Sequence, residues 1–119
     1  MKQVIKLFLI FFLFNSSSQA QEFLLEKTFG YQNDDIFFET IELNDGDYLS
    51  LGWTKSIGNG ETDFFIIKSA SNGNKIWEKT YGGFDLETGI SVKEFANGNF
   101  LLSGTTRSFG SGLGDCIFI

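Results

Sequence analysis

The sequence lacks histidine and proline, and it contains a single cysteine, Cys116. Without histidine there is no Ser-His-Asp triad, no Cys-His pair and no metal site that uses imidazole. One cysteine excludes a framework of disulfides within the chain, and a catalytic thiolate needs a basic neighbour. We therefore expect Cys116 to be a small, buried hydrophobic residue within an apolar strand.

Basic residues are few, with 9 Lys and Arg against 15 Asp and Glu and a net charge of −6. Nucleic-acid binding requires Lys and Arg to neutralise phosphates, so the composition disfavours nucleic acid as a partner. The same charge disfavours anionic membrane surfaces. Cations and neutral polymers such as glycans remain compatible with an acidic surface.

Long apolar runs are also scarce. The run at residues 7–14 is far shorter than the roughly 20 residues that a membrane-spanning helix needs. Two lysines precede this run, and the small-x-small sequence Ser18-Gln19-Ala20 follows it, which is typical of a secretory signal peptide. We predict a helical signal peptide at residues 1–20, a mature domain at residues 21–119 and an exported protein, located at the outer surface, outside the cell or in the periplasm. No membrane span is expected after cleavage.

The chain is rich in the residues of β-structure and its turns. It contains 14 glycines and 15 phenylalanines. Glycine-rich turns between aromatic and β-branched runs indicate an all-β protein.

An internal repeat organises the mature chain. Residues 26–30 (EKTFG) return as residues 78–82 (EKTYG), and the same spacing continues without a gap. The identical pairs that follow are Gly46/Gly98, Leu49/Leu101, Gly52/Gly104, Thr54/Thr106, Ser56/Ser108, Gly58/Gly110, Gly60/Gly112, Asp63/Asp115 and Ile67/Ile119. A period of this length is typical of solenoids, propellers and arrays. We assign repeat 1 to about residues 26–77 and repeat 2, which is truncated, to about residues 78–119.

Each copy is predicted to hold four short strands. The expected strands cover residues 23–29, 36–43, 48–55, 63–69, 75–81, 89–95, 100–107 and 115–119, and tight turns are expected at residues 44–47, 71–74 and 96–99. The unbroken apolar runs at residues 64–67 and 116–119 indicate strands that are buried on both faces.

Four consecutive antiparallel strands in about 40–50 residues make one propeller blade. The predicted fold is therefore two consecutive four-stranded antiparallel meander blades of an incomplete β-propeller. Gly52 and Gly104 fall within strands, where they indicate either a close approach of two backbones or a β-bulge.

Acidic residues in the loops are the candidates for a metal site. Asp34, Asp35, Asp85 and Glu87 occupy equivalent loops of the two copies, and Ca²⁺ binds several carboxylate and carbonyl oxygens. The alternative is turn chemistry, in which such side chains bond to their own backbone. We keep these four as weak candidates for a structural Ca²⁺ and predict no other cofactor. The acidic pair of one turn, Asp45 and Asp47, becomes asparagine in the second copy.

Two further groups allow a functional and a structural interpretation. Asp63 and Asp115 precede apolar strands, where they either form a shared ligand site or accept bonds from loop N–H groups; we favour the second. Trp53 and Trp77 either stack on sugars or belong to the core, and we again favour the second. No catalytic residue can be assigned.

Residues 77–83 (WEKTYGG), residues 97–108 (NGNFLLSGTTRS) and the Gly114-Asp115 pair before an apolar strand together resemble a known repeat. They are similar to the β-propeller repeats, each of roughly 50 residues, of exported and surface proteins of Gram-negative bacteria. Those proteins often carry a C-terminal type IX secretion sorting domain. The resemblance implies a propeller that serves as a scaffold or for binding, and it carries over no catalytic residue.

Fewer than two full copies are present, whereas propellers use about 4–8 blades. We expect the chain to be the N-terminal part of a longer gene product, with self-association into a ring as the alternative. The predicted function is an exported scaffold, ligand-binding or adhesion module without an activity of its own. Its partners would be glycan or protein at the cell surface, together with further blades or other copies of the chain. The alternative is the N-terminal piece of a propeller enzyme, a lyase or glycoside hydrolase, whose active site lies in other blades.

Overall fold

The computed structural model describes residues 26–119, and the predicted signal peptide lies outside this range. Within it the chain forms seven antiparallel strands in two sheets and no helix, so no helix there could cross a membrane. The first sheet has the order β1-β2-β3-β4 and the second the order β5-β6-β7. The bounds are β1 Asp35–Glu42, β2 Tyr48–Thr54, β3 Asp63–Ser69, β4 Lys75–Tyr81, β5 Glu87–Glu94, β6 Phe100–Thr106 and β7 Asp115–Phe118. For residues 26–119 the prediction of an all-β fold of consecutive antiparallel strands is confirmed.

One predicted strand is wrong in the part that the structure describes. Residues 26–30 take no strand conformation, although their counterparts at 78–81 belong to β4. A strand is held by the neighbour to which it bonds, and β4 has β3 as that neighbour. No strand among the described residues precedes residues 26–30. As a result β4 completes the first sheet, although its sequence opens the second copy.

The three predicted tight turns share one geometry. In each, a glycine has a positive φ: 83° at Gly46, 78° at Gly73 and 80° at Gly98. This left-handed conformation favours glycine because other residues place a Cβ atom against the backbone. The same backbone pattern closes each turn, with Gly46 N bonded to Leu43 O at 2.9 Å in the first. Local residues therefore determine all three turns.

Both interpretations of Gly52 hold together. The register passes from Phe37 opposite Gly52 to Glu39 opposite Leu51, so one extra residue bulges from β1. A Cβ atom on Gly52 would fall 1.7 Å from the carbonyl oxygen of Ile36, far inside any permitted contact. The bulge thus lies in the facing strand, and the glycine lets the two backbones approach.

The second sheet repeats this feature. Its bulge lies between Gly89 and Ser91, opposite Gly104 and Ser103. A Cβ atom on Gly104 would fall 2.0 Å from the carbonyl oxygen of Thr88. Glycine recurs at this position because the space is occupied by backbone, which cannot move aside as a side chain can.

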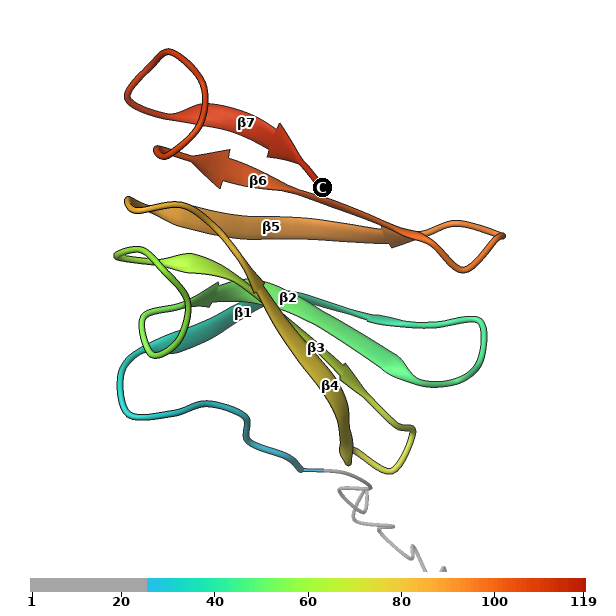
Figure 1. Cartoon of the computed structure of the whole chain (residues 1–119). Helices are drawn as coiled ribbons and strands as arrows, with labels where there is room; N and C mark the ends of the chain where they lie inside the picture. The colour runs from blue at the N-terminus through green and yellow to red at the C-terminus, as the bar shows by residue number, and fades with distance from the viewer. Residues whose placement is uncertain (1–25) are drawn as a thin grey trace, which may run out of the picture.

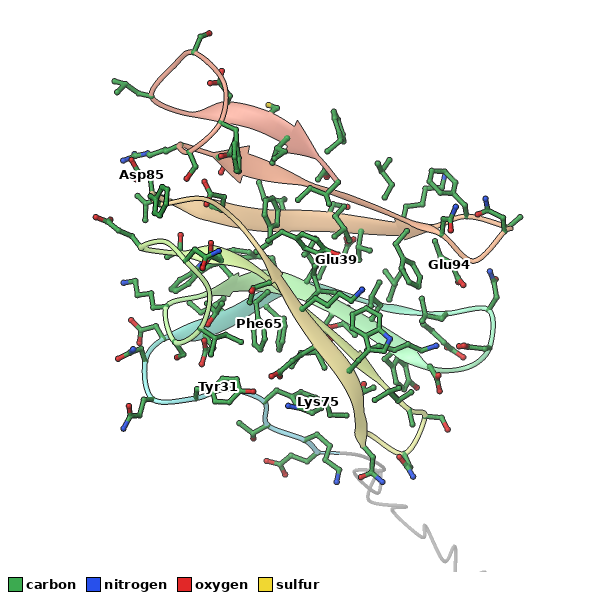
Figure 2. All side chains as sticks on the ribbon, viewed as in Figure 1. Tyr31, Glu39, Phe65, Lys75, Asp85 and Glu94 are labelled. Atoms are coloured by element: carbon green, nitrogen blue, oxygen red, sulfur yellow. The ribbon has the colours of Figure 1, made fainter. Side chains whose placement is uncertain are left out.

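The hydrophobic core lies between the two sheets, which Figure 1 shows stacked with β5 next to the first sheet. The buried residues of this core are Leu43, Leu49, Leu51, Phe64, Ile66, Val92 and Leu102. Polar contacts add to it: Glu39, labelled in Figure 2, accepts a hydrogen bond from the backbone N–H of Val92. Trp77 packs against the core half-buried, and Trp53 is also half-buried. The expectation of core tryptophans holds in part for Trp77, whereas Trp53 is not among the residues packed against this core.

The outward face of the second sheet is open. Cys116 is exposed, and Phe118 beside it keeps 71 % of its surface. The prediction of a buried Cys116 in a strand covered on both faces is therefore wrong. Its counterpart Phe64 is fully buried, because the second sheet packs on that face of the first. No described element packs on the equivalent face of the second sheet.

Candidate functional site

The loops that hold the predicted site residues gather at one end of both sheets, on the left of Figure 1, with the tight turns at the other end. We call this the acidic loop end; it comprises residues 30–34, 55–62, 82–86 and 107–114. Each of the four strands that leave it begins with an acidic residue, namely Asp35, Asp63, Glu87 and Asp115. Their carboxylates face back into the loops and accept hydrogen bonds there.

Asp35 organises the first loop. Its Oδ1 atom accepts a hydrogen bond from the Thr54 hydroxyl. Its Oδ2 atom accepts bonds from the Ser56 hydroxyl at 3.0 Å and from the backbone N–H of Tyr31 at 2.7 Å. One carboxylate thus joins the start of β1, the end of β2 and the segment before β1. All three hydrogen bonds to the Asp35 carboxylate come from donors within residues 26–119.

Glu87 bonds to the counterpart residues one copy later, with a longer side chain, although Ser108 donates through its backbone N–H and Ser56 through its hydroxyl. Its Oε1 atom accepts bonds from the Thr106 hydroxyl at 2.8 Å and from the backbone N–H of Ser108 at 3.1 Å. Its Oε2 atom accepts a bond from the backbone N–H of Gly83 at 2.7 Å. Thr106, Ser108 and Gly83 are the sequence counterparts of Thr54, Ser56 and Tyr31.

We call Asp35 and Glu87 the hubs of the two loops, because each carboxylate accepts several hydrogen bonds there. The two hubs differ in burial. Asp35 is partly exposed, whereas Glu87 is fully buried. Burial alone raises the pKa of Glu87, but the hydrogen bonds from Ser108, Gly83 and Thr106 outweigh it, and the pKa ends below its ordinary value. Glu87 is therefore an ionised, buried carboxylate that is held by donors rather than by a cation of the chain.

Asp63 and Asp115 bond to the glycine-rich loops that precede them, as predicted. The Oδ2 atom of Asp63 accepts bonds from the backbone N–H groups of Asn59 at 2.6 Å and Gly60 at 3.2 Å. Asp115 receives the corresponding bonds from Ser111 and Gly112. This is the structural role that short acidic side chains take beside loops.

The second oxygen of Asp63 is unusual. Asp63 is 1 % exposed, and its Oδ1 atom has no hydrogen-bond partner in the described part of the chain. A Cβ atom on Gly82 would fall 1.8 Å from this oxygen and 2.7 Å from Oε2 of Glu87. Two buried carboxylate oxygens therefore face one small space that only a glycine leaves free. Sequence reasoning missed this pairing because Asp63 and Glu87 start strands of different sheets.

Backbone bonds between the loops bring these two residues together. The N–H of Glu87 bonds to the carbonyl oxygen of Thr62 at 2.9 Å, and the N–H of Glu61 bonds to that of Asp85 at 3.1 Å. Thr62 and Leu86 form a parallel bridge. The loop before β3 is thereby joined to the loop before β5.

The four calcium candidates occupy different environments. Asp34 is exposed, 3.8 Å from the ammonium of Lys55, and Asp35 is the hub described above. Asp85, labelled at the loop end in Figure 2, accepts a bond from the N–H of Leu86 at 2.8 Å. Glu87 accepts hydrogen bonds from loop donors. Among residues 26–119 no group of three acidic side chains could hold a metal ion, so calcium binding stays a prediction.

The acidic turn of the first copy holds a lysine. Lys68 lies 2.7 Å from a carboxylate oxygen of Asp45 and 3.0 Å from one of Asp47. The hydrogen bond between Asp45 and Lys68 lowers the pKa of the acid and raises that of the base. Asp45 also accepts a hydrogen bond within the turn, from the N–H of Asp47 at 3.0 Å, and in the second copy Asn97 accepts the corresponding bond from the N–H of Asn99 at 3.1 Å. The turn geometry therefore does not depend on the charge.

Two grooves share part of their walls, and one of them reaches the acidic loop end. One, of about 440 Å³, runs between β4 and the end of the second sheet, and its walls include Trp77, Lys79, Tyr81 and Ile119. The other, of about 220 Å³, shares Tyr81 and Ile119 and reaches Gly82 and Glu87. The smaller groove also includes Ile117 of β7. Sequence reasoning did not predict these grooves.

Comparison of the chain with protein-family models, with curated proteins and with solved structures gave no match. Any inference about function therefore rests on the residues of the chain itself.

Proposed function

We propose that the chain is an exported scaffold and binding module built from propeller-like blades, each of which covers one face of the blade before it. One observation carries this proposal. Phe64 and Ile66 of the first sheet are buried beneath the second sheet, while their counterparts Cys116 and Phe118 are exposed on an equivalent face. A face of this kind is stabilised when a further sheet covers it.

The acidic loop end is the proposed binding surface. Loops on a rigid scaffold are the usual place for recognition, and here the carboxylates of Asp35 and Glu87 hold them in shape. Asp34 and Asp85 are exposed at this surface, where a ligand could reach them. A neutral glycan, a protein or Ca²⁺ suits this surface better than an anionic partner. We propose no catalytic role for this surface.

Export and binding are tested separately. The full 119-residue chain is expressed in a Gram-negative host, and the periplasmic and extracellular fractions are examined by mass spectrometry. We expect a mature chain that begins at Gln21; retention of residues 1–20 in the cytoplasm would contradict export.

Binding is measured on the purified protein with an array of neutral and acidic glycans, and by calorimetry with Ca²⁺. We expect saturable binding that weakens in the D34N/D85N variant, in which both exposed acids of the loop end are neutralised. Asp45→Asn, at the opposite end, is the matched control. Release of reducing or unsaturated sugar ends from polysaccharides by this chain would favour the enzyme alternative instead.

A further inference from the structure

Two buried acids that belong to different sheets face each other beside Gly82. Asp63, at the start of β3, is 1 % exposed, and Glu87, at the start of β5, is fully buried. A Cβ atom on Gly82 would lie 1.8 Å from Oδ1 of Asp63 and 2.7 Å from Oε2 of Glu87. The two carboxylate oxygens therefore lie close to one common point.

Both oxygen atoms keep part of their capacity to accept bonds. The N–H groups of Asn59 and Gly60 both donate to Oδ2 of Asp63, and Oδ1 has no hydrogen-bond partner in the described part of the chain. Oε2 of Glu87 accepts one hydrogen bond, from the N–H of Gly83 at 2.7 Å. A carboxylate oxygen can accept two such bonds, so this pair can take a further ligand.

No basic side chain compensates the two carboxylates. The ion pairs found among residues 26–119 belong to other acids, and none of them includes Asp63 or Glu87. A buried carboxylate is costly unless a donor or a cation compensates it. A buried acceptor without a partner in the chain is the kind of atom that an ion or a water molecule satisfies.

The backbone holds the two acids in this arrangement. Thr62, which precedes Asp63, accepts a bond from the N–H of Glu87 at its carbonyl oxygen, at 2.9 Å. The hydroxyl of Thr62 donates to the carbonyl oxygen of Glu87 at 2.8 Å. Figure 1 shows the loops before β3 and β5 at the same end of the molecule. The pair is therefore positioned before any ligand arrives, which lowers the entropic cost of binding one.

The chemistry of the pair favours a hard divalent cation. Two carboxylates offer two negative charges and only oxygen ligands, which suit Ca²⁺ and Mg²⁺ better than metals that prefer nitrogen or sulfur. Ca²⁺ binds oxygens at about 2.3–2.6 Å in a flexible geometry and accepts carbonyl oxygens and water as further ligands. Mg²⁺ demands a near-ideal octahedron and retains several waters, so a buried pair of carboxylates suits Ca²⁺ better.

We propose that Oδ1 of Asp63 and Oε2 of Glu87 bind one Ca²⁺ ion, which fastens the loop before β3 to the loop before β5. The ion would thereby stabilise the contact between the two sheets. This site is internal and goes beyond the proposed binding of a surface ligand by Asp34 and Asp85. Glu87 takes part in it together with Asp63, a residue whose role beside its own loop is otherwise structural.

The internal site is tested in the D34N/D85N variant, in which the exposed acids of the loop end are already neutral. Thermal unfolding of the full chain is followed in EDTA and in a series of CaCl₂ concentrations, and calorimetry gives the stoichiometry. NaCl at equal ionic strength controls for screening of the net charge. We expect one ion per chain and a rise in Tm of at least about 5 °C at saturating Ca²⁺. A rise no larger than that in NaCl would overturn the proposal.

Asp63→Asn, added to the same variant, identifies the ligand. Its amide oxygen can still accept the bonds from Asn59 and Gly60, but its N–H₂ group cannot bind a cation. In EDTA the substitution should therefore cost no stability, whereas the Ca²⁺-dependent rise in Tm should disappear. Asp115→Asn is the matched control, because Asp115 makes the corresponding bonds to its own loop; it should keep the full rise. Equal rises in the two variants would overturn the assignment.

If Asp63→Asn does not fold, Glu87→Gln in the same variant replaces it, and loss of the Ca²⁺-dependent rise is again expected. The rise is measured within each variant, so a general loss of stability does not imitate it. A chain that binds a surface ligand through Asp34 and Asp85 but shows no such rise would refute this inference alone. A chain that shows the rise but binds no surface ligand would refute the proposed function alone.

Discussion

The ring of Phe64 fills the space that a side chain on Gly104 would need. A Cβ atom on Gly104 would lie 2.6 Å and 2.8 Å from two carbon atoms of that ring. Gly89 of β5 is paired with Gly104 of β6. A Cβ atom on Gly89 would fall 2.6 Å from a carbon atom of the same ring, so Gly89 also leaves room for Phe64. The two sheets therefore approach each other around one phenylalanine and two glycines.

Gly104→Ala should destabilise the protein strongly. The new methyl group would meet the ring of Phe64 and, at 2.0 Å, the backbone oxygen of Thr88, and backbone cannot move aside cheaply. We expect a loss of about 3 kcal/mol in the free energy of unfolding, measured by urea titration. Gly114→Ala is the control, because nothing lies within 4 Å of its Cβ position; it should change stability by less than about 0.5 kcal/mol. Equal effects of the two would contradict this packing.

Phe64→Ala and Cys116→Ala remove counterpart side chains with unequal results. Phe64 is fully buried between the sheets, and its truncation leaves a cavity that should lower the free energy of unfolding by about 3–5 kcal/mol. Cys116 is exposed, so its truncation should change it by less than about 0.5 kcal/mol. Thermal and urea unfolding of both variants compare them directly. A large effect at Cys116 would mean that this face is covered in solution.

Glu87 should make the free energy of unfolding depend on pH. Its pKa in the folded protein lies below the ordinary value, so the stabilisation is complete above the pKa of the unfolded chain and is lost as pH falls through the folded value. Urea titrations should show the wild-type advantage over Glu87→Gln, about 1–3 kcal/mol near neutrality, shrinking from about pH 5 downward. Asp34→Asn, at an exposed position, serves as the control. An advantage that stays constant down to about pH 3 would argue against an ionised Glu87.

Asp63→Asn should preserve or raise stability, although it alters a buried side chain. The amide oxygen can still accept the bonds from Asn59 and Gly60. The amide N–H₂ group would replace the unpartnered Oδ1 atom and face Oε2 of Glu87 across Gly82. We expect a gain of about 1 kcal/mol in the free energy of unfolding. Asp115→Asn, whose residue is only half-buried, should show no gain. A loss at position 63 larger than that at 115 would show that the second carboxylate oxygen has a partner of its own.

Local chemistry made the strands and turns predictable. The Asp-Gly and Asn-Gly pairs before β2, β4 and β6 specify a turn wherever they occur, since only glycine adopts the required φ without strain. The bulges opposite Gly52 and Gly104 could likewise be predicted, because glycine at the same place in both copies indicates a close approach of two backbones. The failure at residues 26–30 has the opposite cause: a strand exists only where another strand offers its edge.

Fewer contacts of the acidic loop end could be predicted from the sequence. The role of Asp63 and Asp115 could be predicted, because their partners lie within four residues along the chain. The hubs at Asp35 and Glu87 join donors from distant positions, and the facing of Asp63 and Glu87 crosses between sheets. Such contacts depend on how the sheets are stacked, which no local pattern records.

The sequence by itself determined where the seven described strands and the tight turns lie and which positions alternate, because each of those properties depends mainly on a few neighbouring residues. Only the tertiary structure decided that Phe64 is buried while Cys116 is exposed, and that EKTYG pairs as a strand while EKTFG does not. The physical reason is that burial and strand pairing each require two surfaces in contact. A local stretch of sequence specifies one of these surfaces and does not specify which surface packs against it.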